Sequence, residues 1–303
     1  MNKNGCNNDS SEQQAEMLHN NDEDNREYLT LEEIQYELLL MLETAGAWLK
    51  EYGIRYSLSD GSLLGAVRHK GFIPWDDDLD ICMPRPDYEK WIALADKFEV
   101  ETGYKINSCL TDSYHYPFSK ICNPLIRAQE SSVQNGYIGY LWIDVFPFDG
   151  VPRSEAKYKR MLVSRDIRFT LINAMISDES HNRKRTFIKK ALHPICVRLF
   201  TMSTLAKKID TCFSATDYEK AEYVAKPVFG AGRSVLRAEF EKTVMLPFCN
   251  TLQPCMSCWD EWLTKGYGNY MQLPPEDKRC PHPQKTWRVK SAAMMNTQET
   301  CQS

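Results

Sequence analysis

The chain has 303 residues, 43% of them hydrophobic, which is enough to bury the core of one large domain or of a domain with an appended lobe. Its formal net charge of −4 disfavours a broad nucleic-acid-binding surface, because such surfaces make a domain basic. No apolar run approaches the roughly 18–20 residues that span a bilayer, and the polar N-terminus lacks the apolar stretch of a secretory signal. We therefore expect a cytoplasmic protein with no transmembrane segment and no nucleic-acid partner, whose eleven Cys are reduced thiols.

The first ordered element is predicted to be a helix. Residues 1–27 are rich in Asn, Gln, Asp, Glu and Ser and are expected to form a disordered tail. Thr30 and Glu33 have the spacing of a capping box, and apolar residues then recur at helical spacing. The pattern predicts an amphipathic helix over 31–52, ended by a Gly.

Short strands and helices are predicted to alternate up to residue 152. A strand over 54–59 precedes the Asp60-Gly61 turn, and one or two helical turns follow over 62–69. A second strand is predicted over 78–83, with a helix capped by Asp87 after it. The remaining aromatic and aliphatic stretches predict three more strands, over 104–109, 117–122 and 140–146.

The pattern beyond residue 153 is helical and more basic through about 213, and then aromatic and interrupted by Pro. Residues 284–303 are expected to form a loose tail. We predict one domain over 28–283, with an α/β part over about 28–152 and a helical C-terminal lobe over about 153–283. The predicted fold class is α/β, a mixed sheet flanked by helices.

Asp78 and Asp80 are the main candidates for chemistry. On a strand, residues i and i+2 point to the same face, so these two carboxylates can converge on one divalent cation. Hard oxygen ligands of this kind suit Mg²⁺ or Mn²⁺. The alternation also places Leu79 and Ile81 on the opposite, buried face.

The acidic run has two interpretations. A bare Asp-x-Asp is commonly part of a solvated loop. Here, however, four Asp lie within residues 76–80 among apolar and aromatic neighbours, and their partial burial requires a compensating charge. We therefore favour a metal site, and we expect Asp76 and Asp77 to shape the loop or to contact groups around the site.

Two remote segments can join this site. The small turn Gly61-Ser62 offers a hydroxyl and backbone N–H groups at a helix N-terminus, where phosphate binds well, although Gly-Ser turns are also ordinary caps. Asp144 lies inside the apolar strand 140–146 and needs a partner there. That partner is either a metal ion, with Asp144 as third ligand, or a buried Arg or Lys.

A separate cysteine group has two interpretations. Cys255, Cys258, Cys280 and His282 have the ligand types and a tolerable spacing for a structural zinc. The alternative is a set of reduced thiols.

Several motifs carry a family resemblance. Residues 59–69 (SDGSLLGAVRH) and 71–80 (GFIPWDDDLD) closely resemble the LicD family, which includes bacterial phosphocholine transferases and is related to the fukutin-type phospho-sugar-alcohol transferases. Residues 142–147 (WIDVFP) and 267–275 (YGNYMQLPP) also resemble family motifs. Together these segments extend the resemblance over roughly residues 31–283.

The resemblance implies a nucleotidyltransferase-type fold and an enzyme. Gly61 and Ser62 would open the phosphate site, and Asp78, Asp80 and Asp144 would hold the metal. The implied donor is CDP-activated, such as CDP-choline or a CDP-alditol, and the implied acceptor is a hydroxyl of a glycan or glycolipid. An acceptor of that kind is compatible with peripheral membrane association.

Within this interpretation, other residues have open roles. Asp144 is either a metal ligand or the base that takes the acceptor's proton. Arg68 and Lys120 are candidate phosphate contacts, with a solvated basic turn as the alternative for Arg68. Four aromatic residues are candidates either for stacking a base or caging a quaternary ammonium group or for core packing: Trp75, Tyr267, Tyr270 and Trp287.

Two other functions remain as alternatives. A nucleotidyltransferase would use the same carboxylates but add a nucleotide monophosphate and release pyrophosphate. A non-catalytic interaction protein would keep only the fold. The presence of all three carboxylates argues against the second alternative.

Overall fold

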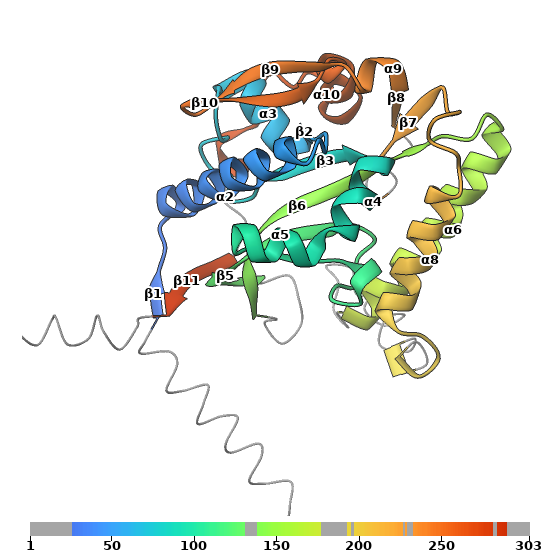
Figure 1. Ribbon diagram of the computed structural model, residues 1–303, viewed down its shortest axis with the longest axis horizontal. Helices are drawn as coiled ribbons and strands as arrows, with labels where there is room; N and C mark the ends of the chain where they lie inside the picture. Colours follow the sequence, from blue (N-terminus) through green and yellow to red (C-terminus); the bar gives the residue numbers. More distant parts are fainter. Residues whose placement is uncertain are drawn as a thin grey trace, which may run out of the picture.

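The computed structural model describes residues 26–130, 138–176, 193–194, 197–226, 228, 233–280 and 284–289. Eleven strands of this part form one mixed sheet, with the order β1-β11-β5-β6-β3-β2-β10-β9 along its main path (Figure 1). In addition, β4 pairs with β5, and β7 links β6 to β8. The strands are β1 (Arg26–Tyr28), β2 (Ser57–Leu58), β3 (Asp80–Pro84), β4 (Lys105–Asn107), β5 (Ser119–Glu130), β6 (Ile138–Gly150), β7 (Tyr223–Ala225), β8 (Ser234–Leu236), β9 (Thr243–Phe248), β10 (Thr251–Met256) and β11 (Gln284–Val289).

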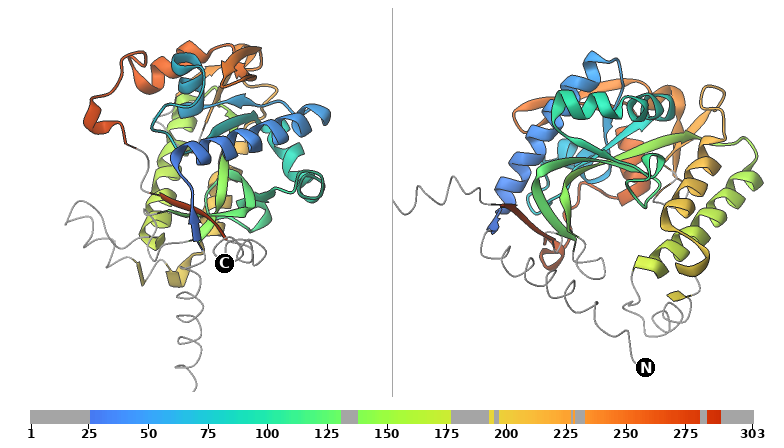
Figure 2. Two further views of the ribbon diagram at one scale, coloured as in Figure 1. Left: turned by 90° about the vertical axis from the view of Figure 1, so that its left-hand side faces the viewer. Right: turned by 60° about the horizontal axis from the view of Figure 1, so that its bottom comes forward.

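Helices cover the sheet, which confirms the predicted α/β class. Figure 1 shows α2, α4 and α5 along one face, and α2 and α4 pack on β6. Helices α6 and α8 pack on each other beside the sheet, around a second small core that includes Ile172, Leu205 and Phe213 (Figure 2). The helices are α2 (Leu31–Glu51), α3 (Asp60–His69), α4 (Arg85–Ala93), α5 (Ala95–Thr102), α6 (Glu155–Ile176), α8 (Met202–Ser214), α9 (Arg237–Phe240) and α10 (Trp259–Tyr267).

The first helix is formed as its sequence predicts. The Thr30 Oγ1 accepts the N–H of Glu33 at 3.3 Å, and a Glu33 carboxylate oxygen accepts the N–H of Thr30 at 2.8 Å, which is a complete capping box. Its apolar stripe, including Leu38, Leu42 and Leu49, is fully buried in the main core. The helix ends at Glu51, and Gly53 follows with a positive φ of 60°.

The other predicted elements exist with shifted bounds. The strand expected over 54–59 is only β2, the strand expected over 78–83 is β3, and the one expected over 117–122 continues to Glu130. Asp87 does not cap α4. Its carboxylate instead accepts the N–H of Arg55 at 2.9 Å and pairs with the Arg55 guanidinium, a tertiary contact that no local pattern indicates.

The C-terminal part differs most from expectation. Helices α6 and α8 lie in the region predicted to be helical, but the chain then returns to the sheet, where β10 pairs in parallel with β2. The predicted loose tail starts with a strand: β11 pairs with β5 and with β1, so the two ends of the described chain lie side by side (Figure 2). The remainder of both predicted tails, 1–25 and 290–303, lies outside the described residues.

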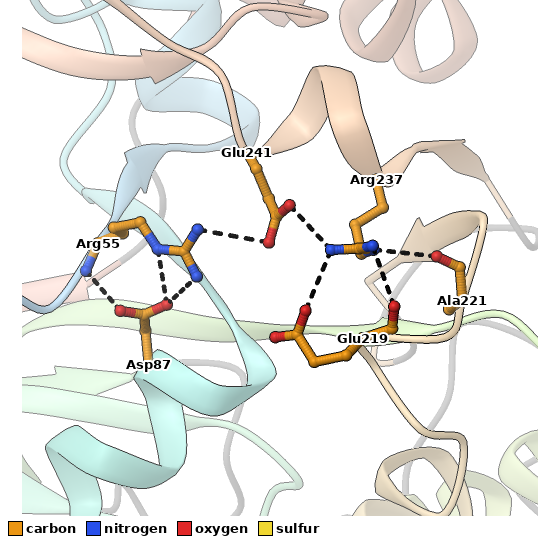
Figure 3. Close-up of polar contacts among 6 residues, drawn as sticks. All are labelled: Arg55, Asp87, Glu219, Ala221, Arg237 and Glu241. Atoms are coloured by element: carbon orange, nitrogen blue, oxygen red, sulfur yellow. Dashed lines mark hydrogen bonds and ion pairs between the residues drawn. The ribbon is translucent and has the colours of Figure 1, made fainter.

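Ion pairs tie the C-terminal part to the sheet. Buried Arg85 binds Asp149 at 2.6 Å and Asp210 at 2.9 Å, which attaches α8 to the ends of β3 and β6. Burial opposes the charge of Arg85, but its two carboxylate partners outweigh burial and raise its pKa. Figure 3 shows a second connection, in which Glu241 lies between Arg55 and Arg237.

One further result concerns membranes. Among the described residues, no helix has both the length and the apolar character needed to cross a bilayer.

Candidate active site

The predicted carboxylates Asp80 and Asp144 lie next to each other at the centre of the sheet. They are register partners in the parallel pair β3 and β6, and the N–H of Asp144 donates to the carbonyl of Leu79 at 2.9 Å. Lys120 on β5 is the register partner of Asp144 from the other side. Register partners present their side chains on the same face, so three adjacent strands carry an ordered row of Lys120, Asp144 and Asp80.

Strand alternation explains why this row faces away from the core. Leu79, Ile81 and Val145 occupy the intervening positions, and each is at most 1% exposed. These side chains belong to the main hydrophobic core on the opposite face of the sheet. Burying them therefore orients the polar row.

Negative charge converges on Asp80. Its pKa is raised well above the ordinary value, first by burial and then by the charges of Asp78, Asp60 and Asp144. Asp78 precedes β3 rather than lying in it, because the strand begins at Asp80. The prediction that Asp78 and Asp80 share one face of a strand is therefore wrong, although the charges of Asp78 and Asp144 both act on Asp80.

The Gly61-Ser62 segment lies against the same group. Helix α3 begins at Asp60, and the Ser62 hydroxyl accepts the N–H of Asp80 at 2.8 Å. A Cβ on Gly61 would be 3.0 Å from a carboxylate oxygen of Asp76 and 3.8 Å from one of Asp80. A side chain at this position would crowd the Asp76 carboxylate and contact that of Asp80, so this segment lies directly against the acidic residues. Its phosphate-binding role remains a prediction.

Asp60 is a member of the site that sequence reasoning treated only as part of a turn. It is buried, adopts a positive φ of 43°, and accepts a hydrogen bond from the Ser59 hydroxyl at 2.7 Å. Its carboxylate also pairs with Lys226 and approaches Arg233 at 4.0 Å. Burial opposes its ionisation, but Lys226 outweighs burial and lowers the pKa of Asp60.

Lys226 also was not found from the sequence. Its ammonium lies 4.0 Å from the centre of the Phe146 ring and lowers the pKa of Asp80, against the larger raising effects there. Lys226 is 166 residues from Asp60, and no local motif links the two. The apolar stretch before it (YVA in β7) was the only available signal, since a Lys after such a strand needs a partner.

The two predicted phosphate contacts have different surroundings. The ammonium of Lys120 lies 3.8 Å from Asp144 and 3.6 Å from the centre of the Trp142 ring. Arg68, in the last turn of α3, donates to the carbonyl of Tyr270 at 2.8 Å and so holds the C-terminal segment in place. Phosphate binding by either residue remains a prediction.

The four aromatic candidates do not form a common cage. Trp75 lies beside His69 and Arg279, Tyr270 donates to Asp260, and Trp287 is buried in β11. Burial of the Tyr267 hydroxyl and then the charges of Asp60 and Asp80 raise the pKa of this phenol. The hydroxyl therefore faces the acidic group, while 45% of the residue as a whole is exposed. A different aromatic group lines a pocket at β5 and β6, and its residues include Tyr114, Tyr116, Tyr140 and Trp142.

Two groups of residues were candidates for binding a metal ion, the cysteine group and the acidic residues. Cys255 and Cys258 are buried and Cys280 is exposed, while His282 lies outside the described residues. Within the described ranges, no three Asp, Glu, His or Cys side chains are already arranged to hold a metal ion. The acidic residues therefore provide converging charge and hard oxygen atoms rather than a complete coordination shell.

These features define a class of protein. A mixed α/β sheet carries carboxylates on adjacent parallel strands, with a helix N-terminus against them, as in a nucleotidyltransferase-like fold. The family described as "LicD/FKTN/FKRP, nucleotidyltransferase domain" matches residues 53–206. The lipopolysaccharide cholinephosphotransferase LicD of Haemophilus influenzae is 30% identical over 264 residues, which are 84% of this chain and 96% of that protein.

A shorter match connects a second branch of the family. The ribitol 5-phosphate transferase FKRP of Homo sapiens is 58% identical over 33 residues, which are 11% of this chain and 7% of that protein. The chain therefore belongs to the LicD/FKTN/FKRP family, and it is a phosphotransferase.

Proposed function

We propose that the protein transfers phosphocholine or a phospho-alditol from a CDP-activated donor to a hydroxyl of a glycan or glycolipid and releases CMP. The observation that carries this proposal is the row of Asp80, Asp144 and Lys120 across three adjacent strands of a LicD-family chain. The names of its relatives support it, since one is a cholinephosphotransferase and the other a ribitol 5-phosphate transferase.

Asp78, Asp80 and Asp144 are the proposed ligands of Mg²⁺ or Mn²⁺. Their oxygen atoms are the type that these ions prefer, and a cation would offset both the burial and the carboxylate repulsion that raise the pKa of Asp80. Bound there, the ion would neutralise negative charge on the donor's phosphates.

The proposed transfer is a single displacement at phosphorus, in which side chains of the protein handle the proton and the phosphate charge. The acceptor oxygen attacks the phosphorus that carries the head group, the bond from that phosphorus to the bridging oxygen breaks, and CMP leaves with that oxygen. Asp144 serves either as a ligand or as the base for the acceptor's proton, and both roles use the same carboxylate. Lys120 pairs with Asp144 and Lys226 pairs with Asp60, so both ammonium groups are proposed to offset phosphate charge.

A glycolipid acceptor requires contact with a membrane surface. We propose that a cytoplasmic protein reaches such an acceptor by peripheral association.

The direct test is product analysis. The protein is incubated with Mg²⁺, a glycan acceptor, and in turn CDP-choline, CDP-ribitol and the four nucleoside triphosphates. CMP release that depends on the acceptor supports the proposal, whereas pyrophosphate release would establish a nucleotidyltransferase instead. Asp80→Asn is expected to abolish turnover, and Asp96→Asn, an exposed change on α5, is the matched control.

A further inference from the structure

A pocket beside the acidic row is lined largely by aromatic side chains. It lies between β4, the segment that precedes β5, and strands β5 and β6. Around it are Asn107, Tyr114, Tyr116, Lys120, Tyr140 and Trp142. Among the described lining residues, Lys120 alone carries a permanent charge, so they offer ring faces together with one ammonium group.

The pocket and the proposed reaction centre share one face of the sheet. Trp142 and Tyr140 are two and four positions before Asp144 on β6, so their side chains point to the same side as this carboxylate. Same-face neighbours on a strand are about 7 Å apart. A group attached to a phosphate at Asp144 is therefore within reach of the pocket.

The position of Lys120 shows that the aromatic rings of the pocket bind an ammonium group. Its ammonium lies 3.6 Å from the centre of the Trp142 ring and 5.2 Å from that of Tyr114, within the roughly 6 Å range of a cation–π contact. Its side chain is only 8% exposed, and Asp144 is 3.8 Å away. Two aromatic residues thus already bind an ammonium group beside the reaction centre.

We propose that this pocket binds the quaternary ammonium head group of the transferred phosphate ester, and that Lys120 leaves the Trp142 ring for the donor phosphate when the head group enters. This inference rests on the proposed function and narrows it from phosphocholine or a phospho-alditol to a cationic head group. An acyclic alditol carries no charge and has no flat face to place on the rings, whereas a trimethylammonium group replaces the contact that Lys120 makes.

The charges require the movement of Lys120. A trimethylammonium group cannot lose its charge, and two cations on one ring repel each other. A donor phosphate beside Asp144 attracts the Lys120 ammonium away from the ring, and the long side chain permits this shift. Lys120 would thereby couple occupation of the pocket to contact with the phosphate.

The test compares ligands on the full-length protein with Mg²⁺. Isothermal titration measures the Kd of phosphocholine, ribitol 5-phosphate, CMP and tetramethylammonium. We expect phosphocholine to bind at least about tenfold more tightly than ribitol 5-phosphate, which corresponds to about 1.4 kcal/mol. Tetramethylammonium should compete with phosphocholine and leave CMP binding unchanged.

Substitutions of Trp142 test whether this pocket is the site that binds the head group of phosphocholine. Trp142→Leu should weaken phosphocholine binding about tenfold, Trp142→Phe should weaken it less because a ring face remains, and neither should alter CMP binding. Tyr36→Leu, which removes an aromatic residue that is 66% exposed on α2, is the control. Melting curves confirm that each variant folds.

Three results would overturn the inference: equal affinity for the two phosphate esters, no effect of Trp142→Leu, or loss of CMP binding in that variant, which would make the pocket a nucleobase site. The proposed function fails separately, through absence of acceptor-dependent CMP release from every CDP-linked donor.

Discussion

Asp80 combines two properties that conflict in the absence of a cation, namely burial and proximity to three other carboxylates. Burial and the charges of Asp78, Asp60 and Asp144 raise its pKa above the unfolded-state value. Ionisation is therefore harder in the folded protein. The free energy of unfolding is highest below the unfolded-state pKa and falls as pH rises toward the folded-state pKa.

This conflict predicts that Asp80→Asn stabilises the metal-free protein while it abolishes turnover. The amide cannot ionise, so the variant does not bear the cost of holding an acid where burial and neighbouring carboxylates disfavour its charge, and Tm in EDTA should exceed that of the unmodified protein, by about 2–4 °C per kcal/mol for domains of about 150–250 residues. Melting curves recorded from pH 4 to pH 8 provide the measurement. The difference in Tm should grow with pH, and a lower Tm for Asp80→Asn throughout this range would contradict the electrostatic account.

Replacing Lys226 is expected to destabilise the protein, in contrast to Asp80→Asn, because the buried Asp60 carboxylate then lacks its main partner. Lys226→Met should reduce the free energy of unfolding by about 3–5 kcal/mol, measured by urea denaturation. Lys220→Met is the matched control: its side chain is 84% exposed and pairs with Asp217, a surface contact that contributes about 0–1 kcal/mol. Adding Asp60→Asn to Lys226→Met should restore much of the loss, and failure to do so would mean that packing, not charge, sets the effect.

At the scale of the element, a buried ion group attaches helix α8 to the sheet, in addition to its apolar packing on α6. Asp210 in α8 shares the Arg85 guanidinium with Asp149 of β6, and all three side chains are at most 7% exposed. Arg85 keeps Asp149 as a partner, so Asp210→Ala should speed amide hydrogen exchange in α8 by a factor that corresponds to about 1–3 kcal/mol, whereas the central residues of β6 should keep their protection. Uniform loss of protection over both elements would instead show that α8 and the sheet unfold as one unit.

Local patterns predicted the elements that local chemistry determines. The capping box of α2 and the alternation around Asp80 and Asp144 are complete in the sequence, so the helix start and the shared polar face could both be expected. Asp87 was assigned as a cap because Asp often occupies that position, but the distant Arg55 competes for its carboxylate. Strand β11 was missed because its pairing with β1 and β5 brings together segments far apart in the chain.

At the scale of the whole molecule, the site is assembled from both halves of the chain. The carboxylates come from residues 60–144, whereas Lys226, Arg233 and Tyr267 approach them from the C-terminal third. Residues that meet only after folding leave no spacing signal, which is why the sequence indicated Asp78, Asp80, Asp144 and Lys120 but not the contacts of Lys226 and Arg233 with Asp60.

This division predicts that donor and metal together stabilise the molecule more than either does alone. A ligand that contacts both halves binds the folded state only, so at a concentration of 100 Kd it should add about 2.7 kcal/mol to the free energy of unfolding. Thermal-shift measurements with Mg²⁺, with CDP-choline and with both compare the three conditions, and EDTA should reverse the increase. Asp80→Asn should lose the dependence on Mg²⁺, whereas Asp96→Asn should keep it. Equal Tm shifts with and without Mg²⁺ would indicate that the donor binds without a metal ion. The basic residues of the C-terminal third would then be the contacts of the donor's phosphates.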